Sequence, residues 1–387
     1  MKGRHKIPFN HPSIVGRELE YIEDAVRGGR LAGDGPFTQR CQKWLEERCG
    51  AHKVLLTHSC TAALELAALL CEVGEGDEVI MPSFTFVSTA NAFVLRGARP
   101  VFVDIRPDTL NLDEALIEAA ITSRTRAVVP VHYAGVSCAM EPILEIARRH
   151  GLRVIEDAAQ GLGSTFDGRS LGTLGDLGCW SFHETKNFIS GEGGALIVQD
   201  EALAGRAEIL REKGTNRARF FRGEVDKYTW VDIGSSYLPS ELVAAYLFAQ
   251  LERSEEIMRK RRGIFETYRA ELEDLELQGA VRLPVVPDRC EHNGHMFYLL
   301  LPTEQRRDEL IAHLDRAGIN AVFHYVPLHE SPMGSGFGYA PGDLPITESA
   351  SRRLLRLPCY FTLGEEQQME VIVEVRRFFV QRAKAAV

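Results

Sequence analysis

Short apolar runs recur at regular intervals through the first half of the chain. Runs as short and continuous as these are typical of strands that are buried on both faces of a sheet. The seven runs are Val54–Thr57, Glu78–Met81, Pro100–Asp104, Ala127–Val131, Arg153–Glu156, Leu177–Phe182 and Ala195–Val198. Most of them are separated by segments with helical periodicity, which are Thr61–Cys71, Phe86–Leu95, Leu112–Ile121 and Met140–His150. Strands alternating with helices predict an α/β fold on a seven-stranded, mainly parallel sheet covered on both faces.

The alternation of apolar runs and helical segments is less regular before and after this region. Ahead of it we expect an N-terminal arm, a helix at Val15–Val26 and a loop at Leu31–Pro36. After it, two further segments have helical periodicity, Glu201–Lys213 and Pro239–Leu275. A loop over residues 214–234, rich in arginine and aromatic residues, lies between them. The C-terminal part carries apolar runs at Met296–Leu301 and Ala321–Tyr325 and helices at Asp308–Ala317 and from Glu365. We therefore predict a large domain over residues 1–249, which includes the arm, and a smaller α/β domain over residues 250–387.

Composition narrows the class of protein. A chain of 387 residues is too long for one ordinary core, which supports two domains. The formal charge of -9 gives no reason to expect nucleic acid as a partner. The first residues lack the apolar core of a secretory signal, and no apolar run approaches the roughly 18 residues that span a bilayer. The eight cysteines are scattered without a C-x-x-C pair, which favours a reducing compartment. We expect a cytoplasmic enzyme without a membrane partner.

The residues that follow the apolar runs suggest where the chemistry lies. In a parallel sheet the ligand sits beyond the carboxyl ends of the strands. The first run is followed by Ser59, Cys60 and Thr61 at the start of a helix, and the second by Phe86. The fifth run is followed by Asp157 and Gln160, and Ser181 at the end of the sixth precedes Lys186. Phosphate donors, an aromatic ring, a carboxylate and an amine are therefore expected on one rim of the sheet.

Lys186 is the most informative residue on this rim. It lies in a polar loop between the run Leu177–Phe182 and a glycine cluster at Gly191, Gly193 and Gly194. An amine held there can form a Schiff base when desolvation or a nearby charge lowers its pKa. Taken alone, a solvated loop lysine is the simpler interpretation.

Asp157 supplies what a Schiff-base lysine needs. An aldehyde cofactor acts as an electron sink when its ring nitrogen stays protonated, and a facing carboxylate favours that protonated form. Asp157 ends the expected strand next to the one before Lys186, so one ring could touch both residues. Alone, Asp157 would be interpreted as a turn or capping aspartate.

The remaining rim residues are weak signals individually. Ser59, Cys60 and Thr61 stand where a strand gives way to a helix, which suits a phosphate but also describes an ordinary helix cap. Phe86 could lie against the cofactor ring, although an aromatic residue after a strand is more often part of a core. Gln160 could reach a ring hydroxyl, and Ser181 could reach the phosphate. These residues gain weight from their joint position.

Five strings carry a resemblance to a known family. They are Ser59–Glu65, Pro82–Asn91, Val154–Gln160, Ser181–Asn187 and Gly191–Gly194. The chain resembles, over nearly its whole length, the DegT/DnrJ/EryC1/StrS sugar aminotransferases, which have the fold-type I architecture of aspartate aminotransferase and use pyridoxal 5'-phosphate.

The resemblance implies a role for each rim residue. Lys186 would be the Schiff-base lysine, and Asp157 the partner of the pyridine nitrogen. Gln160 would contact the ring hydroxyl and Phe86 would stack on the ring. The residues that would surround the phosphate are Cys60, Thr61 and Ser181. The same resemblance implies a homodimer with shared active sites.

Two positions differ from the common family pattern. Many members have glycine where Cys60 stands. Many also have a Gly-Tyr-Asn-Tyr-Arg string where this chain has Gly234–Leu238. The asparagine of that string reaches a neighbouring subunit's phosphate, so Ser236 would make a shorter or water-bridged contact there. The missing arginine, at Leu238, affects the substrate pocket more than the cofactor site.

Within the family, the chain most resembles the members that transfer an amino group from glutamate to C4 of TDP-4-keto-6-deoxyglucose. The stretches that carry this closer match are Lys213–Arg217, Asp226–Trp230, Asp232–Tyr237 and Phe323–His329. The product of those members is TDP-4-amino-4,6-dideoxygalactose. Basic residues for the nucleotide diphosphate would be Lys213, Arg217, Arg219 and Arg222, and sugar-pocket candidates would be His324 and His329. A solvated basic loop and satisfied core histidines are the simpler alternatives for these residues. Two other reactions fit the same motifs: transfer of the amino group to a C3 ketone of a nucleotide sugar, and transfer to C4 that gives the gluco-configured product.

Other classes of protein fit less well. An NAD-dependent oxidoreductase would share the alternating pattern, but no G-x-G-x-x-G motif follows an expected strand. No H-E-x-x-H motif occurs, and no metal site is expected. Dehydratases of the same family replace the lysine by histidine, so Lys186 argues against them although His183 is close. The intact set of Lys186, Asp157 and Gln160 also disfavours a non-catalytic binding protein with this fold.

Overall fold

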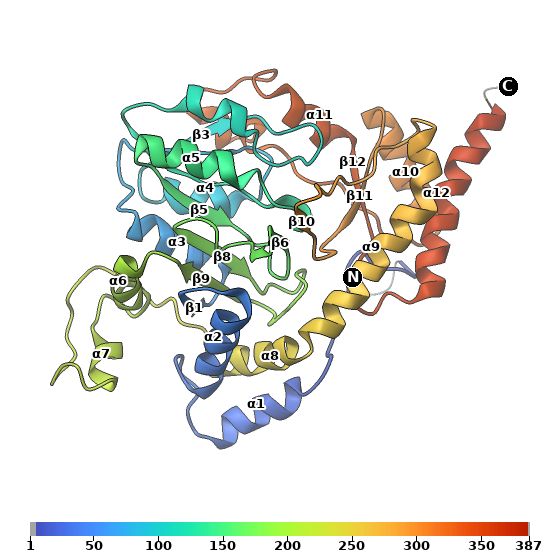
Figure 1. Ribbon diagram of the computed structural model, residues 1–387. Helices are drawn as coiled ribbons and strands as arrows, with labels where there is room; N and C mark the ends of the chain where they lie inside the picture. The colour runs from blue at the N-terminus through green and yellow to red at the C-terminus, as the bar shows by residue number, and fades with distance from the viewer. Residues whose placement is uncertain (1–4, 386–387) are drawn as a thin grey trace.

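A seven-stranded sheet forms the centre of the molecule (Figure 1). The computed structural model describes residues 5–385, so the outermost residues of both expected domains, 1–4 and 386–387, lie outside the described part. The strands are β1 (Lys53–Thr57), β2 (Glu78–Pro82), β3 (Arg99–Val103), β4 (Thr125–Val128), β5 (Arg153–Asp157), β8 (Leu177–Ser181) and β9 (Gly194–Val198). Their order is β1-β9-β8-β5-β4-β2-β3. Only β9 runs antiparallel to its neighbours, β1 and β8. All seven expected runs are strands, and the predicted fold class is confirmed.

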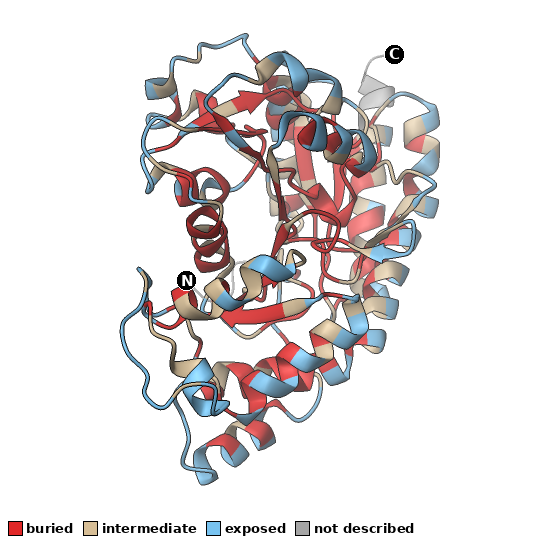
Figure 2. Ribbon diagram, turned by 60° about the vertical axis from the view of Figure 1, so that its left-hand side comes forward, coloured by how far each residue is buried: buried red, intermediate tan, exposed pale blue. Residues whose placement is uncertain are grey.

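Helices cover both faces of this sheet because successive side chains of a strand point to opposite sides. Leu55 of β1 packs in a core with α3 (Cys60–Leu70), α4 (Val87–Val94) and α6 (Glu201–Arg211). Its neighbours Val54 and Leu56 face the other side. There the covering helices are α1 (Glu18–Arg27), α2 (Pro36–Cys49), α5 (Met140–His150) and α8 (Glu241–Glu252). Figure 2 shows the buried inner sides of the helices and their exposed outer sides.

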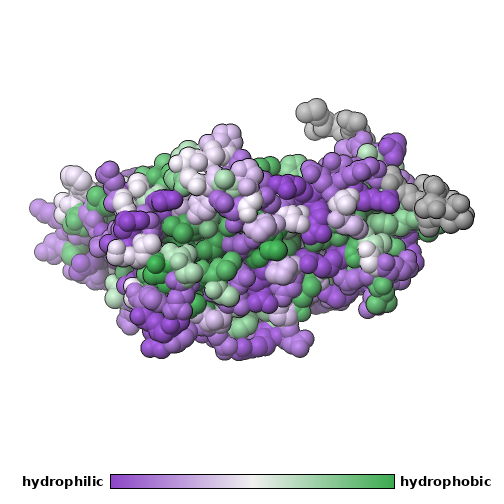
Figure 3. Space-filling view, turned by 90° about the horizontal axis from the view of Figure 1, so that it is seen from above, coloured by the Kyte–Doolittle hydropathy of each residue, from purple (hydrophilic) through white to green (hydrophobic). Residues whose placement is uncertain are grey.

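The C-terminal part has its own apolar core and a two-stranded antiparallel sheet of β11 (Phe297–Leu300) and β12 (Leu354–Leu357). The helices around it are α9 (Ser254–Leu277), α10 (Glu304–Arg316), α11 (Pro345–Arg353) and α12 (Glu365–Ala385). A small sheet links the two parts through β6 (Thr165–Phe166), β7 (Arg169–Ser170) and β10 (Cys290–Glu291). Among the described residues, no helix combines the length and the apolar character that crossing a membrane requires. From above, the molecule is mostly hydrophilic, and its apolar side chains gather near the middle of that face (Figure 3).

Several expected elements differ from the structure. Leu112–Ile121 is not an α-helix but two short 3-10 turns, Glu114–Leu116 and Glu118–Ala120. Leu112 pairs with Ile105 as a β-bridge and Ile121 is extended, so both ends of the segment are held out of helical geometry.

The long helical pattern from Pro239 to Leu275 is interrupted. It forms α8 and α9, which are separated at Arg253, whose backbone (φ -102°, ψ 14°) departs from helical geometry. The run Ala321–Tyr325 contributes a single bridge, between Val322 and Arg356, and no strand. The loop over residues 214–234 contains a short helix, α7 (Arg217–Phe221), which projects beside α6 (Figure 1).

Candidate active site

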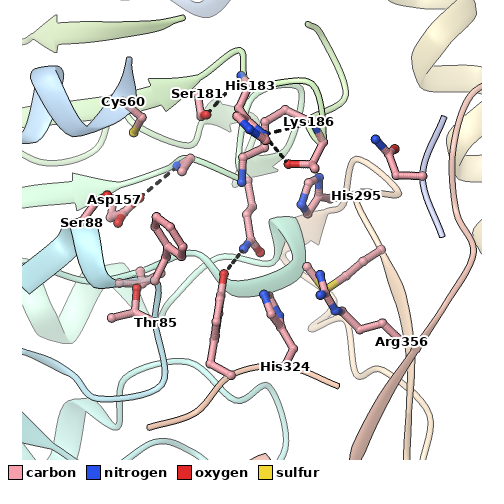
Figure 4. Close-up of a pocket in the computed structure, with 18 of the residues that line it drawn as sticks. Cys60, Thr85, Ser88, Asp157, Ser181, His183, Lys186, His295, His324 and Arg356 are labelled. Atoms are coloured by element: carbon pink, nitrogen blue, oxygen red, sulfur yellow. Dashed lines mark hydrogen bonds between the residues drawn. The ribbon is translucent and has the colours of Figure 1, made fainter. Parts of the chain in front are cut away.

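A cavity of about 770 Å³ opens at the carboxyl ends of the parallel strands. Eight of the residues expected at the site line it, which are Cys60, Thr61, Phe86, Asp157, Gln160, Ser181, Lys186 and His324. In Figure 4, Cys60 and Asp157 enter from the left of the view, and His295 and Arg356 enter from the right. The cavity is therefore shared between the large sheet and the C-terminal part of the chain.

The loop that carries Lys186 is fixed by backbone hydrogen bonds between its two ends. Phe182 N–H donates to Gly193 C=O (2.8 Å), and Ser190 N–H donates to Phe182 C=O (2.7 Å). The cavity walls desolvate the Lys186 amine, which lowers its pKa, although the nearby Cys60 and Asp157 act in the opposite direction. A lowered pKa leaves more of the amine unprotonated and nucleophilic at neutral pH.

Asp157 is held in a fixed orientation at the end of β5. Its Oδ2 accepts a hydrogen bond from Thr89 Oγ1 (2.6 Å) on α4, and its Oδ1 accepts one from Ala159 N–H (3.1 Å). Thr85 Oγ1 lies 2.7 Å from Thr89 Oγ1 and extends this chain of hydroxyls. The carboxyl group is 5% exposed, so its remaining lone pairs are directed at the cavity rather than at bulk water.

The start of α3 offers donors to an anion. Ser59 caps the helix by accepting from Ala62 N–H (3.1 Å), and no hydrogen bond from the N–H of Cys60 or Thr61 forms in the described part of the chain. The Thr61 hydroxyl lies 2.7 Å from that of Ser88, and both line the cavity. Free N–H groups at a helix N-terminus, with hydroxyls beside them, suit a phosphate group.

Gln160 is oriented by two partners. Its Oε1 accepts from Ala134 N–H (2.7 Å), and its Nε2 donates to the Tyr325 hydroxyl (3.0 Å). One hydrogen of Nε2 stays available to a ligand. Because Tyr325 accepts this bond, its own hydroxyl hydrogen can be donated into the cavity that it also lines.

Several cavity residues were not predicted from the sequence, among them Ser88, His295, Tyr325 and Arg356. Arg356 follows an apolar pattern on β12, and its guanidinium lies 4.6 Å from the centre of the Phe9 ring. Its Nε is buried without a hydrogen-bond partner among the described residues. Tyr325 lies within Phe323–His329, but nothing in the pattern separated it from its neighbours.

The other expected residues lie elsewhere in this chain. Arg219 and Arg222 pair with Glu224, and Arg217 pairs with Glu212, around α7. Lys213 and Ser236 are exposed at the base of the same loop, outside the cavity lining. His329 is also outside the lining and is 1% exposed.

The position of His329 matches the simpler alternative of a core histidine. Its Nδ1 lies 2.7 Å from the Ser83 hydroxyl, and its Nε2 lies 3.3 Å from a Glu348 oxygen.

The cavity has the groups that pyridoxal phosphate requires. A carboxylate for the ring nitrogen, a helix N-terminus with hydroxyls for the phosphate and one amine for the aldehyde all face the same space. The donor chemistry therefore fits this cofactor.

Comparisons with known proteins agree with this geometry. Residues 12–376 match the model of the DegT/DnrJ/EryC1/StrS aminotransferase family. The spore coat polysaccharide biosynthesis protein SpsC of Bacillus subtilis is 36% identical over 383 residues, which cover 97% of each chain. GDP-perosamine synthase of Caulobacter vibrioides is 36% identical over 379 residues, covering 97% of this chain and 99% of that protein.

A solved structure identifies the cofactor. The sugar aminotransferase Spr1654 of Streptococcus pneumoniae, in its PLP-form, superimposes with a TM-score of 0.89 at 26% identity, covering 96% of this chain and 98% of that chain. A PMP-form of the same protein is also similar. The cofactor is pyridoxal 5'-phosphate, and the chain belongs to the DegT/DnrJ/EryC1/StrS family of sugar aminotransferases.

Proposed function

We propose that this enzyme transfers an amino group from glutamate to the C4 ketone of TDP-4-keto-6-deoxyglucose. The product would be TDP-4-amino-4,6-dideoxygalactose, for a surface polysaccharide. The observation that carries the aminotransferase part is the Lys186 amine, with its lowered pKa, in the same cavity as the fixed Asp157 carboxylate. The choice of sugar rests on the strings that resemble the C4 transaminases.

We propose the following roles around the cofactor. Asp157 holds the ring nitrogen, Gln160 the ring hydroxyl, and Phe86 lies on the ring. The residues for the phosphate are Cys60, Thr61 and Ser181, with Ser88 added by the structure. When bound, pyridoxal phosphate carries the amino group between the two substrates and its ring accepts the electron pair of the broken C–H bond.

Lys186 is the proposed base. With its amine free, Lys186 would take the proton from the α carbon of the donor and would give the same proton back in the course of the amino transfer. A positioned base typically contributes a rate factor of roughly a hundred to ten thousand. Desolvation in the cavity lowers the pKa of the amine, which favours the unprotonated form that this role needs.

Arg356 is the proposed site for the carboxylate of the amino donor. Its guanidinium faces the cavity from the C-terminal part, and its Nε lacks a partner among the described residues. A guanidinium forms paired hydrogen bonds with a carboxylate, and an incoming glutamate would satisfy the orphaned group. His324 lines the same wall and is the proposed contact for the sugar.

We also propose a homodimer with shared sites. The loop over residues 214–234 projects from the body and exposes large apolar side chains, with Trp230 77% exposed and Phe221 64% exposed. A second copy would cover these side chains. It would also bring the exposed Ser236, Lys213, Arg219 and Arg222 and the half-buried Arg217 to the partner's cavity.

The proposed domain division follows the separate cores. The C-terminal core draws on residues from α9 onward, together with Ile7 of the arm. The three clusters around the large sheet draw mainly on earlier residues. We keep 1–249 and 250–387 as the proposed domains. The eight free thiols in the described structure favour the proposed cytoplasmic location.

The test is a half-reaction with defined product analysis. The enzyme is loaded with pyridoxamine phosphate and mixed with TDP-4-keto-6-deoxyglucose, and the absorbance of the aldehyde form of the cofactor is followed. NMR of the sugar product then identifies the carbon and the configuration of the new amine. An axial amine at C4 is the expected result. An equatorial amine, or reaction only with a 3-keto sugar, would overturn the proposed substrate and leave the aminotransferase assignment intact.

Two variants separate the parts of the proposal. Lys186→Ala should abolish turnover with both substrates, and appreciable activity in this variant would overturn the role of Lys186. Arg356→Met should weaken the half-reaction with glutamate and spare the half-reaction with the keto sugar. Equal losses in both half-reactions would argue against Arg356 as the carboxylate site.

A further inference from the structure

His295 is a buried histidine of the cavity wall that the proposed function does not use. It is 8% exposed and lies just before β11. Its backbone is anchored on both sides, because its N–H donates to Asn293 Oδ1 (3.0 Å) and its C=O accepts from Arg261 Nη2 (2.6 Å). The imidazole therefore has little freedom to move.

Asn187 is the residue after Lys186, and its side-chain amide faces His295. The hydrogen bonds of Asn187 fix which way round this amide lies. Asn187 Nδ2 donates to the backbone carbonyl of Asn293 (2.9 Å). A carbonyl oxygen can only accept, so the amide cannot be reversed without placing two oxygens against each other. Asn187 Oδ1 therefore faces His295 Nδ1, at 3.0 Å.

This contact sets the tautomer of the histidine. Asn187 Oδ1 can only accept, so His295 Nδ1 must carry the hydrogen. Burial lowers the pKa of His295 well below its ordinary value, and the nearby cations Lys186, Arg261 and Arg356 lower it further. The ring is therefore neutral at pH 7, and its Nε2 carries a lone pair.

The lone pair of Nε2 has no partner among the described residues, although the ring lines the cavity. Figure 4 shows His295 and Lys186 on the same side of this space. Because the ring faces the cavity, a ligand or a moving group can supply the donor for this acceptor. Lys186 has hydrogens to donate whenever it is free of the cofactor.

We propose that His295 positions the free Lys186 amine by accepting one of its hydrogens at Nε2. The inference rests on the proposed aminotransferase function and deepens it. The bond points the amine lone pair toward the reacting carbon while Lys186 waits as the base. Lys186 takes and returns the substrate proton, and His295 neither gains nor loses a proton during the cycle. Asn187 acts through His295 by holding its tautomer.

The first test observes the histidine directly by ¹⁵N NMR. Protein labelled at histidine nitrogens is loaded with pyridoxamine phosphate, the form in which Lys186 is free, and His295→Gln identifies the resonances. We expect a neutral ring protonated at Nδ1, with the Nε2 resonance shifted by a hydrogen bond. The shift should be absent in Lys186→Ala loaded in the same way. A ring protonated at Nε2, or an Nε2 resonance unaffected by Lys186→Ala, would overturn the proposal.

The same sample tests the alternative partner of Nε2. If a substrate hydroxyl is the donor, the Nε2 resonance of Lys186→Ala should move when the nucleotide keto-sugar is added. That result, without an effect of Lys186 itself, would also overturn the proposal. These measurements do not depend on turnover. They can therefore fail while the loss of activity in Lys186→Ala still supports the proposed function.

Kinetics give the second test. His295→Leu removes the acceptor and should lower kcat about a hundredfold with little change in KM, since small misplacements of a reacting group have effects of that order. His295→Gln restores a polar group near the position of Nε2 and should recover part of the loss. His313→Gln, at a histidine of α10 paired with Glu374 outside the cavity lining, is the matched control and should behave as wild type. The positioning role would be contradicted if His295→Leu and His295→Gln raised KM equally and left kcat unchanged.

Discussion

Thr89 shows how a single hydroxyl controls the cofactor site. It donates to Asp157 Oδ2 at 2.6 Å and is fully buried. Thr89→Val keeps the shape and removes the donor, so Asp157 loses one of its two fixed bonds. Hydrogen bonds to charged groups contribute about 1.5–3 kcal/mol, and we expect affinity for pyridoxal phosphate to fall at least about tenfold. Thr89→Ser retains the hydroxyl and should bind nearly as well.

The measurement is an absorbance titration of the apoprotein with pyridoxal phosphate. Equal affinities for Thr89→Val and Thr89→Ser would show that the methyl group matters rather than the hydroxyl. Thr85→Val is a further comparison, because Thr85 contacts Thr89 and not Asp157. It should have a smaller effect than Thr89→Val.

The sequence could predict that Lys186 and Asp157 lie together, because strand ends in a parallel sheet meet at one edge, and both line one cavity. Thr89 and Arg356 could not be identified this way. Thr89 reaches Asp157 only because the first turn of α4 lies at the end of β5, and Arg356 reaches the cavity from a strand of another sheet. The proposed roles of Asn187 and His295 depend on the orientation of the Asn187 amide, which its hydrogen bond to the Asn293 carbonyl fixes. A sequence pattern carries no information about that orientation.

At the scale of elements, the close contact between β9 and the start of α3 positions the proposed phosphate site. A Cβ added at Gly194 would lie 2.4 Å from Cys60 N. Gly194→Ala must therefore push the helix N-terminus away from the strand. Overpacking of this kind costs about 1–3 kcal/mol, and we expect a lower midpoint of urea unfolding together with weaker cofactor binding.

Gly205→Ala is the matched control for this prediction. Gly205 lies within α6, and nothing is within 4 Å of an added Cβ. Alanine favours a helix interior over glycine by about 0.8–1.0 kcal/mol, so this variant should be slightly more stable than wild type. If Gly194→Ala were as stable as Gly205→Ala, the contact would not be tight in solution.

The elements themselves were predicted with uneven success, for physical reasons. Buried parallel strands show as continuous apolar runs, and all seven were found. The segment after Leu112 has helical spacing, but its β-bridge to Ile105 holds the chain extended at the start. α2 was not recognised because its buried residues, such as Phe37 and Leu45, alternate with many polar ones.

At the scale of the whole molecule, buried neutral histidines predict how stability changes with pH. Burial lowers the pKa of both His295 and His324 well below the ordinary 6.5. Below pH 6.5 the unfolded chain binds protons that the folded chain does not, so the free energy of unfolding falls as pH falls. Each fully neutral histidine contributes up to about 1.4 kcal/mol per pH unit. Stability of the apoprotein should therefore be highest above pH 6.5 and decrease toward pH 5.

Urea unfolding at pH 7 and pH 5 measures this dependence. His324→Gln removes one of the two groups, so the difference between its two midpoints should be smaller than in wild type. His313→Gln, outside the cavity lining, is the comparison for the loss of a histidine elsewhere in the chain. If His324→Gln kept the full wild-type difference between the two midpoints, the pH dependence of stability would come from groups other than His324.

The last prediction concerns sites shared between two subunits. If Ser236 of one subunit approaches the phosphate in its partner's cavity, Ser236→Asp places a carboxylate against that phosphate and should inactivate the enzyme. Lys186→Ala is inactive for a different reason. In a mixed dimer of the two variants, one cavity combines an intact Lys186 with an intact Ser236, and the other has neither. Random exchange makes half of the dimers mixed, so the mixture should recover about a quarter of wild-type activity.

The outcome distinguishes shared from separate sites because neither variant is active alone. Activity of the exchanged mixture, measured after the subunits have been dissociated and reassociated, would require Lys186 and Ser236 of one site to come from different chains. An inactive mixture, with mixed dimers confirmed by mass spectrometry, would contradict the shared site. Ser235→Asp adds the same charge at the neighbouring exposed residue. Successive residues of extended chain point to opposite sides, so that charge should not face the phosphate and Ser235→Asp should stay active.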